Sequence, residues 1–145
     1  MPCFDDKNLS ASRAEPAQAT LVYVWSPRMV LSAQHAASAL RQAHQQGLAF
    51  VAVHDARVPG DELQAALARL ASTPDAIWLP SVQALSASQS LCAATLIARD
   101  ALRHFPTAFV VQASGLVHRH AIVGAMPEAA WAHSIALRLR SEAAP

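Results

Sequence analysis

Two continuous apolar runs, separated by one long helical pattern, constrain the fold of this chain more than any other feature. Residues 21–26 (LVYVWS) and 48–55 (LAFVAVHD) are rich in β-branched and aromatic side chains. Such runs are typical of central strands covered on both faces. Between them, Ser26-Pro27 fits a helix N-cap followed by proline at the first helical position, and Gly47 fits the helix end. This order predicts a right-handed parallel βαβ unit.

The helix predicted between the two strands has one apolar stripe. Its members recur at spacings of three and four residues, as expected for a helix that packs on a sheet. They are Val30, Ala33, Ala37, Leu40 and Ala43.

The rest of the chain predicts a second helix, a short strand, a further helix and a final hairpin followed by a last helix. Pro59-Gly60-Asp61-Glu62 opens a helix through Ala71, with acids in the first turn, where the helix dipole favours them. Residues 76–79 (AIWL) form a strand candidate, and a helix is expected within 88–100. Residues 104–124 predict two antiparallel strands joined around Ser114-Gly115, and a last helix runs from Met126-Pro127-Glu128 through Arg140.

Composition limits the classes to which the chain can belong. With 145 residues, 53% of them hydrophobic and 14% charged, it fits one compact domain, expected over 19–145, preceded by a polar leader over 1–18. The net charge of +1 and a single lysine leave no basic stripe for nucleic acid or an anionic membrane. Polar residues interrupt every apolar run before it reaches the ~18–20 residues of a membrane span, so no transmembrane segment is expected.

The order βαβ followed by ββα resembles the thioredoxin fold, an α/β fold with a central mixed sheet flanked by helices. LVYVWS resembles the family's central strand, and Phe105-Pro106-Thr107 resembles the loop that carries its cis-proline. Gly115 and Val123-Gly124 resemble the turn and the closing glycine of its last hairpin. The resemblance covers roughly residues 19–140. The extra strand and helix between Pro74 and Arg103 are similar to the insertion of the exported, TlpA-like branch.

The resemblance implies a redox site that this sequence does not have. Aligning Trp25 with the aromatic residue a few positions before the family's CxxC motif puts Met29-Val30-Leu31-Ser32 at that motif. The other register puts Ser26-Pro27-Arg28-Met29 there, and neither contains cysteine. Thioredoxin chemistry needs a thiolate of lowered pKa and a second, resolving thiol. We therefore expect no thioredoxin-type oxidoreductase activity and no catalytic residue.

In place of catalysis the resemblance implies a binding site between the start of the first helix and the proline loop, where extended ligands pair with free backbone groups. The expected function is a non-catalytic binding, adaptor or chaperone-like module whose partner is a protein or extended peptide, with no cofactor and no metal. Phe105–Pro106 is expected to be cis. The expected binding residues are Trp25, Met29, Ser32, Phe105, Pro106 and Thr107.

Three alternatives rest on other side chains. Met29 and His104 together suit Cu(I), which would make the chain a copper-handling protein. His118 and His120, on one face of a predicted strand, would permit metal chelation. Ser32 with His35 would supply a nucleophile and a base, but no oxyanion motif or orienting acid accompanies them, so hydrolase activity is not expected.

The two cysteines, Cys3 and Cys92, offer a further alternative, a thiol-disulfide protein. They are too few for a disulfide framework, although one bridge between them is compatible with an oxidising compartment. Residues 1–19 contain acids where a signal peptide would have basic and apolar regions. The chain is therefore expected to be periplasmic if a signal peptide has been removed, and cytoplasmic otherwise.

Overall fold

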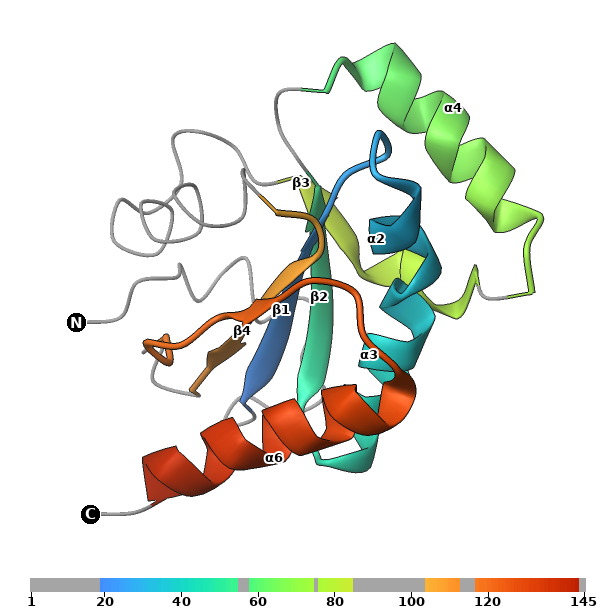
Figure 1. Cartoon of the computed structure of the whole chain (residues 1–145). Coiled ribbons are helices and arrows are strands. Elements are labelled where there is room, and N and C mark those ends of the chain that lie inside the picture. The colour runs from blue at the N-terminus through green and yellow to red at the C-terminus, as the bar shows by residue number, and fades with distance from the viewer. Residues whose placement is uncertain (1–18, 55–57, 75, 85–103, 113–116, 144–145) are drawn as a thin grey trace.

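The computed structural model describes residues 19–54, 58–74, 76–84, 104–112 and 117–143 (Figure 1). Its sheet has five strands in the order β3-β2-β1-β4-β5. The strands are β1 (Thr20–Trp25), β2 (Ala49–His54), β3 (Val82–Ala84), β4 (Thr107–Val111) and β5 (Ile122–Val123). The helices are α2 (Val30–Gln34), α3 (Ala36–Gln45), α4 (Gly60–Ala71), η1 (Ala76–Ser81, a 3-10 helix) and α6 (Glu128–Ala143).

Strand β1 is central and has a parallel neighbour on one side and an antiparallel neighbour on the other. It pairs in parallel with β2, and β2 pairs in parallel with β3. It pairs antiparallel with β4, and β4 pairs antiparallel with β5. The predicted mixed sheet is therefore confirmed. Both strands at the edges of this sheet, β3 and β5, are very short.

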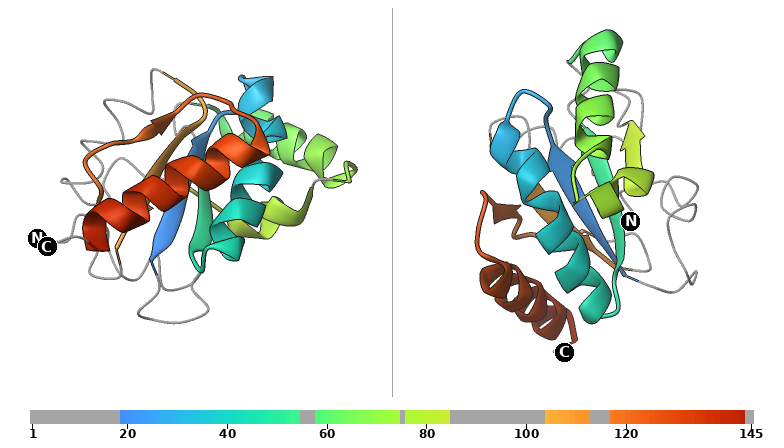
Figure 2. Two further views of the ribbon diagram at one scale, coloured as in Figure 1. Left: turned by 60° about the horizontal axis from the view of Figure 1, so that its bottom comes forward. Right: turned by 90° about the vertical axis from the view of Figure 1, so that its right-hand side faces the viewer.

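The two faces of β1 belong to two different cores, because successive side chains of a strand point to opposite faces. Leu21, Tyr23 and Trp25 pack with the apolar sides of the helices, whereas Val22 and Val24 pack with β2 and β4 side chains. Figures 1 and 2 show α3 and α6 lying side by side over the first face. Among the described residues, those packed in the second core come from strands and loops and none comes from a helix.

Aromatic side chains fill the centre of the first core. Trp25 meets Trp78 edge to face, with ring centroids 4.9 Å apart, and Tyr23 lies 5.8 Å from Trp131 of α6. Trp78 belongs to the segment 76–79, which was predicted as a strand. That prediction is wrong, since the segment is the 3-10 helix η1 and the strand follows it at Val82–Ala84. The 3-10 turn places the Trp78 indole against Trp25, where it is almost fully buried.

The helix expected to begin at Pro27 begins three residues later and is divided in two. Met29 is the N-cap of α2, and His35 interrupts the helix before α3. Val30, expected to pack on the sheet, is exposed because it lies in the first turn of α2, beyond the end of the strand. Gly47 follows the end of α3 at a φ of 79°, which confirms the predicted stop.

The other helices have nearly the predicted bounds. Helix α4 begins at Gly60 and ends at Ala71, and α6 begins at Glu128. Glu128 also joins α6 to α3, because it accepts hydrogen bonds from the Arg41 guanidinium (2.8 Å) and from the Gln42 amide (2.7 Å). The hydrogen bond from Arg41 is the main cause that lowers the pKa of Glu128. No described helix is long and apolar enough to cross a bilayer.

The described part of the final hairpin pairs over fewer residues than the sequence predicted. Among the described residues of its second strand, Ile122 and Val123 pair with β4, and Val117 makes an isolated bridge with Val111. The predicted turn at Ser114-Gly115, the helix within 88–100 and the leader over 1–18 lie outside the described residues. The boundary between that leader and the domain stays a prediction.

Candidate functional site

A buried hydroxyl organises the chain between β1 and α2. Ser32 Oγ accepts a hydrogen bond from the Ser26 backbone N–H (3.0 Å) and lies within donating distance of the carbonyls of Ser26 (3.0 Å) and Met29 (2.6 Å). The Met29 N–H in turn donates to the Ser26 carbonyl at 3.0 Å. Ser32 is fully buried. It therefore fixes the turn Ser26–Met29 and leaves α2 to begin at Val30.

The last residue of this turn and the first two residues of α2 present three consecutive apolar side chains to solvent. The exposed fractions are 48% for Met29, 64% for Val30 and 57% for Leu31. We call these three residues the α2 apolar surface. Single exposed apolar residues are common on proteins, whereas these three are contiguous at one helix end.

An ion pair ties the same turn to α4. The Arg28 guanidinium donates from Nε to Glu62 Oε1 (2.8 Å) and from Nη2 to Oε2 (2.9 Å), a two-bond geometry that fixes direction as well as distance. The hydrogen bond from Arg28 is the main cause that lowers the pKa of Glu62. The first turn of α4 therefore stands beside the residues that precede the α2 apolar surface.

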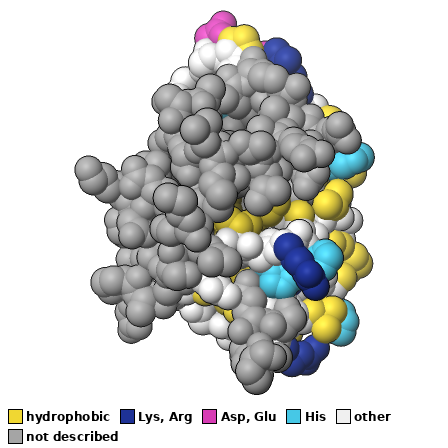
Figure 3. Space-filling model, turned by 90° about the vertical axis from the view of Figure 1, so that its left-hand side faces the viewer, with side chains coloured by type: hydrophobic (Ala, Val, Ile, Leu, Met, Phe, Trp, Pro, Cys, Tyr) yellow, Lys and Arg dark blue, Asp and Glu magenta, His cyan; other side chains and the backbone are white. Residues whose placement is uncertain are grey.

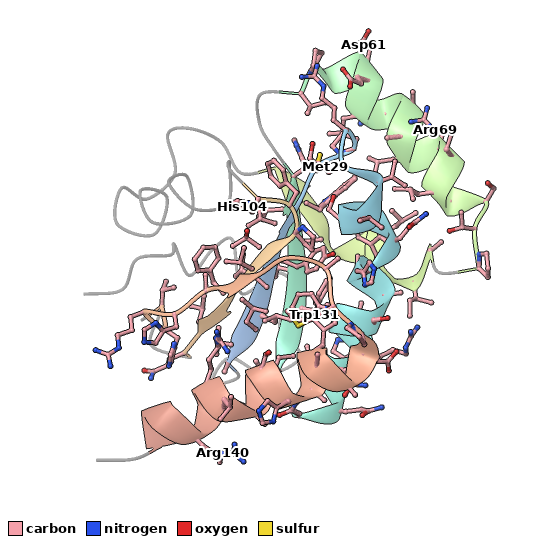
Figure 4. The ribbon with its side chains drawn as sticks, viewed as in Figure 1. Met29, Asp61, Arg69, His104, Trp131 and Arg140 are labelled. Atoms are coloured by element: carbon pink, nitrogen blue, oxygen red, sulfur yellow. The ribbon has the colours of Figure 1, made fainter. Side chains whose placement is uncertain are left out.

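The proline loop lies at the same end of the sheet. The Phe105–Pro106 peptide is cis, as expected. Pairing of Val24 with Thr107 ends the antiparallel ladder, and continuing that register places Pro106 beside Trp25. Gly124, at a φ of 95°, donates its N–H to the Pro106 carbonyl at 2.8 Å. Figure 4 shows the labelled Met29 and His104 at this one end of the sheet.

Three of the expected binding residues are buried too deeply to touch a ligand. Trp25, Ser32 and Thr107 each have no exposed surface. Trp25, expected at or beneath the rim of the site, lies in the core, where Trp78 meets it edge to face. Thr107 donates its hydroxyl to the His104 carbonyl, so it shapes the loop. Ser32 shapes the turn in the same way.

Met29 and the half-buried Phe105 are the expected residues that remain in reach of a ligand, since Pro106 is buried. Sequence reasoning missed Val30 and Leu31. The sequence contained a signal for them. Apolar residues in the first turn of a helix that follows a strand lie beyond the end of that strand, so they do not pack on the sheet as the rest of the helix does.

The described residues do not assemble the Ser–His pair or a His-based metal site, which the sequence raised as alternatives. The Ser32 hydroxyl contacts backbone only, and His35 Nδ1 lies 3.1 Å from the Met126 carbonyl, so these two side chains form no nucleophile–base pair. His118 and His120 lie in a turn between Val117 and β5, not on a strand. Within the described ranges, no three His, Cys, Asp or Glu residues gather as a metal site. Cys3 and Cys92 lie outside the described residues.

Comparison with known proteins finds its matches among solved structures. No family model and no curated protein matches the sequence. A Chlorobium tepidum protein assigned as thiol:disulfide interchange protein DsbE superposes with a TM-score of 0.59 at 19% identity, covering 92% of this chain and 83% of that one. StoA from Bacillus subtilis gives 0.57 at 12% identity, covering 83% and 84%. A secreted Mycobacterium tuberculosis disulfide oxidoreductase homologous to DsbE gives 0.53 at 14%, covering 88% and 85%. The chain therefore has the thioredoxin-like fold of DsbE-type proteins.

Proposed function

We propose that this thioredoxin-fold chain is a non-catalytic module that binds an extended segment of a partner protein at the α2 apolar surface. The observation that carries the proposal is the exposure of Met29, Val30 and Leu31 in succession, at the place where the dithiol motif aligns. The cis-proline loop with Phe105 lies at the same end of the sheet and supplies a second contact region. An adaptor or chaperone-like role would use the same surface.

The chemistry of the two aligned positions supports binding over catalysis. Met29 offers a thioether, which forms no disulfide, and the Ser32 hydroxyl is engaged with three backbone groups. Without a thiolate and a resolving thiol, thiol–disulfide exchange cannot proceed at these positions. An insulin-reduction assay that shows dithiol-dependent turnover, surviving alanine at Cys3 and Cys92, would contradict this proposal.

The apolar area sets the expected strength of binding. Complete burial of one such side chain is worth about 1.5–3 kcal/mol, and each of the three is roughly half exposed at the start. Covering all three therefore contributes about 3 kcal/mol before the backbone contacts of an extended ligand are added. The surface suits a reversible partner of modest affinity.

The proposal is tested with Val30→Asp, which places a charge in the α2 apolar surface without touching the core. Full-length protein is applied to an array of apolar peptides, and dissociation constants of the bound peptides are measured by fluorescence anisotropy. We expect Val30→Asp to weaken binding at least about tenfold, because the carboxylate must lose water against apolar atoms. The control, Gln34→Asp, introduces a charge on the exposed last residue of α2 and should bind as the unmodified protein does. Equal binding by both variants would exclude the α2 apolar surface.

Copper binding through Met29 and His104 is the rival function, and both side chains are exposed at the same end of the sheet. Titration with Cu(I) separates the two functions. Sub-micromolar affinity that is lost in Met29→Ala would favour the rival.

We also propose that the chain works outside the cytoplasm. The secreted M. tuberculosis oxidoreductase and a pneumococcal exposed lipoprotein thioredoxin share its fold, which supports this location. Fractionation of native cells with an antibody against the domain tests it, and recovery only with the cytoplasm would refute it.

A further inference from the structure

The α2 apolar surface contains a methionine, and methionine is the aliphatic side chain that a mild oxidant makes polar. The chain has three methionines, Met1, Met29 and Met126, of which Met1 lies outside the described residues. Met29 has 48% of its surface exposed, whereas Met126 is half-buried and packs against the first core. Because a peroxide must reach the sulfur to oxidise it, exposure favours Met29 over Met126 as the site of reaction.

The two described methionines are also held in different ways. The Met126 sulfur lies 3.9 Å from the Ser134 hydroxyl, which donates to it. Met29 is held through its backbone, since its N–H donates to the Ser26 carbonyl (3.0 Å) and its carbonyl accepts from the Ser32 N–H (2.9 Å). An oxygen atom added to the Met29 sulfur leaves these two backbone hydrogen bonds in place. Oxidation would therefore change the α2 apolar surface and keep the turn that presents it.

The surroundings of Met29 admit a small oxidant without local unfolding. Val30 and Leu31, next in the chain, are 64% and 57% exposed. Figure 4 shows Met29 in the loop that leads from β1 into α2. Figure 3 shows apolar and charged side chains together at the upper end of the molecule, which is the end at which α4 begins in Figure 1. The thioether of Met29 is therefore within reach of water-soluble reagents.

We propose that Met29 is a site of reversible oxidation and that its sulfoxide weakens binding of the partner segment at the α2 apolar surface. This inference rests on the binding function proposed above. In the reaction the O–O bond of a peroxide breaks, one oxygen atom bonds to the Met29 sulfur, and the other leaves as water or an alcohol. The sulfur loses two electrons and the peroxide gains them. A methionine sulfoxide reductase reverses the change, with two thiols oxidised to a disulfide and water released.

The sulfoxide disfavours the bound state because it adds a polar oxygen to an apolar contact. That oxygen must lose its water when a segment covers the surface, and the side chains of Val30 and Leu31 offer it no hydrogen bond. We expect the dissociation constant to rise at least about fivefold. Val30 and Leu31 contain no sulfur and stay apolar, so binding is weakened and not abolished.

The first measurement needs no partner. The full chain is treated with hydrogen peroxide, and mass spectrometry of its proteolytic peptides gives the rate of sulfoxide formation at each methionine. We expect Met29 to react at least about tenfold faster than Met126, because its sulfur is the more exposed. Equal rates at the two residues would overturn the inference and leave the proposed binding function untouched.

The second measurement is binding of a fluorescein-labelled peptide of alternating leucine and serine, followed by fluorescence anisotropy. The full chain is measured untreated, after peroxide, and after repair by a methionine sulfoxide reductase. Dithiothreitol is added after the peroxide, because it reverses disulfides and sulfenic acids but not the sulfoxide. We expect peroxide to weaken binding at least about fivefold and the reductase to restore it.

Two variants assign the effect to one sulfur atom. In Met29→Leu, which has no sulfur at this position, the dissociation constants before and after peroxide should agree. The matched control Met126→Leu should keep the whole peroxide effect, and circular dichroism checks that both variants fold. A peroxide effect that persists in Met29→Leu, or unchanged binding by protein oxidised at Met29, would overturn the inference. If the untreated protein bound no apolar peptide, the proposed function itself would be refuted, and the effect inferred for the sulfoxide with it.

Discussion

Replacing Ser32 by alanine should destabilise the protein although no ligand touches this residue. Without the hydroxyl, the buried Ser26 N–H loses its acceptor, whereas the carbonyls of Ser26 and Met29 each keep a backbone donor. An unsatisfied buried N–H costs about 1–3 kcal/mol, so we expect the free energy of unfolding to fall by about 2 kcal/mol. For a domain of this size that lowers the melting temperature by about 6 °C.

Urea unfolding followed by the fluorescence of the buried tryptophans measures this change. Ser72→Ala is the matched control, because the Ser72 hydroxyl donates to a carbonyl at an exposed helix end and its loss should cost under about 0.5 kcal/mol. If Ser32→Ala were as mild as Ser72→Ala, the Ser32 hydroxyl would not organise the turn, and the explanation given for the start of α2 would be refuted.

Two further predictions concern the same region. Tyr23, the only tyrosine, donates its buried hydroxyl to the Ser32 carbonyl, and burial raises its pKa above the unfolded value of about 10. The stability that the buried hydroxyl contributes is present below that pH and is lost as the pH rises above it. The free energy of unfolding in urea should therefore fall more steeply above about pH 10 in the unmodified protein than in Tyr23→Phe. Parallel curves for the two proteins would refute this. In a background without the two native cysteines, Met29→Cys with Ser32→Cys should gain insulin-reducing activity, because the pair spans the first turn of the helix. Activity in Ser26→Cys with Met29→Cys instead would show that the other register is correct.

The order of elements was predictable because it depends on local patterns. The two apolar runs are long enough to specify buried strands, and Gly47 and Pro59-Gly60 mark helix boundaries through backbone preferences that need no tertiary contact. The mixed sheet then follows from the topology of these elements. The absence of cysteine from both registers in which the family's dithiol motif could be aligned was equally visible in the sequence.

The start of the first helix was not predictable from local preference alone. Ser26-Pro27 satisfies the usual pattern of a cap and a first helical residue, but the Ser32 hydroxyl, six residues further on, takes the Ser26 N–H and holds a turn there. The pattern cannot reveal which of two competing hydrogen-bond arrangements is lower in free energy. Met29 becomes the N-cap as a result.

Burial of the aromatic side chains likewise depended on partners distant in sequence. Trp25 is covered by Trp78, whose indole reaches the core from the 3-10 helix η1. A short apolar run is compatible with either a strand or a helix, so its sequence could not separate them. The ion pair between Arg28 and Glu62 could not be predicted either, since it depends on where α4 lies relative to the turn.

The shortness of both edge strands has a consequence for the behaviour of the protein at high concentration. An exposed strand edge is a template on which another chain can add, and this is the usual beginning of fibrous aggregation. Here β3 pairs through three residues and β5 through two, and Arg138 engages the carbonyls that precede β5. The described sheet edges therefore offer a strand of another molecule few backbone groups with which to form hydrogen bonds. Aggregation by strand addition is therefore disfavoured at both described edges, although Met29, Val30 and Leu31 are exposed elsewhere on the protein.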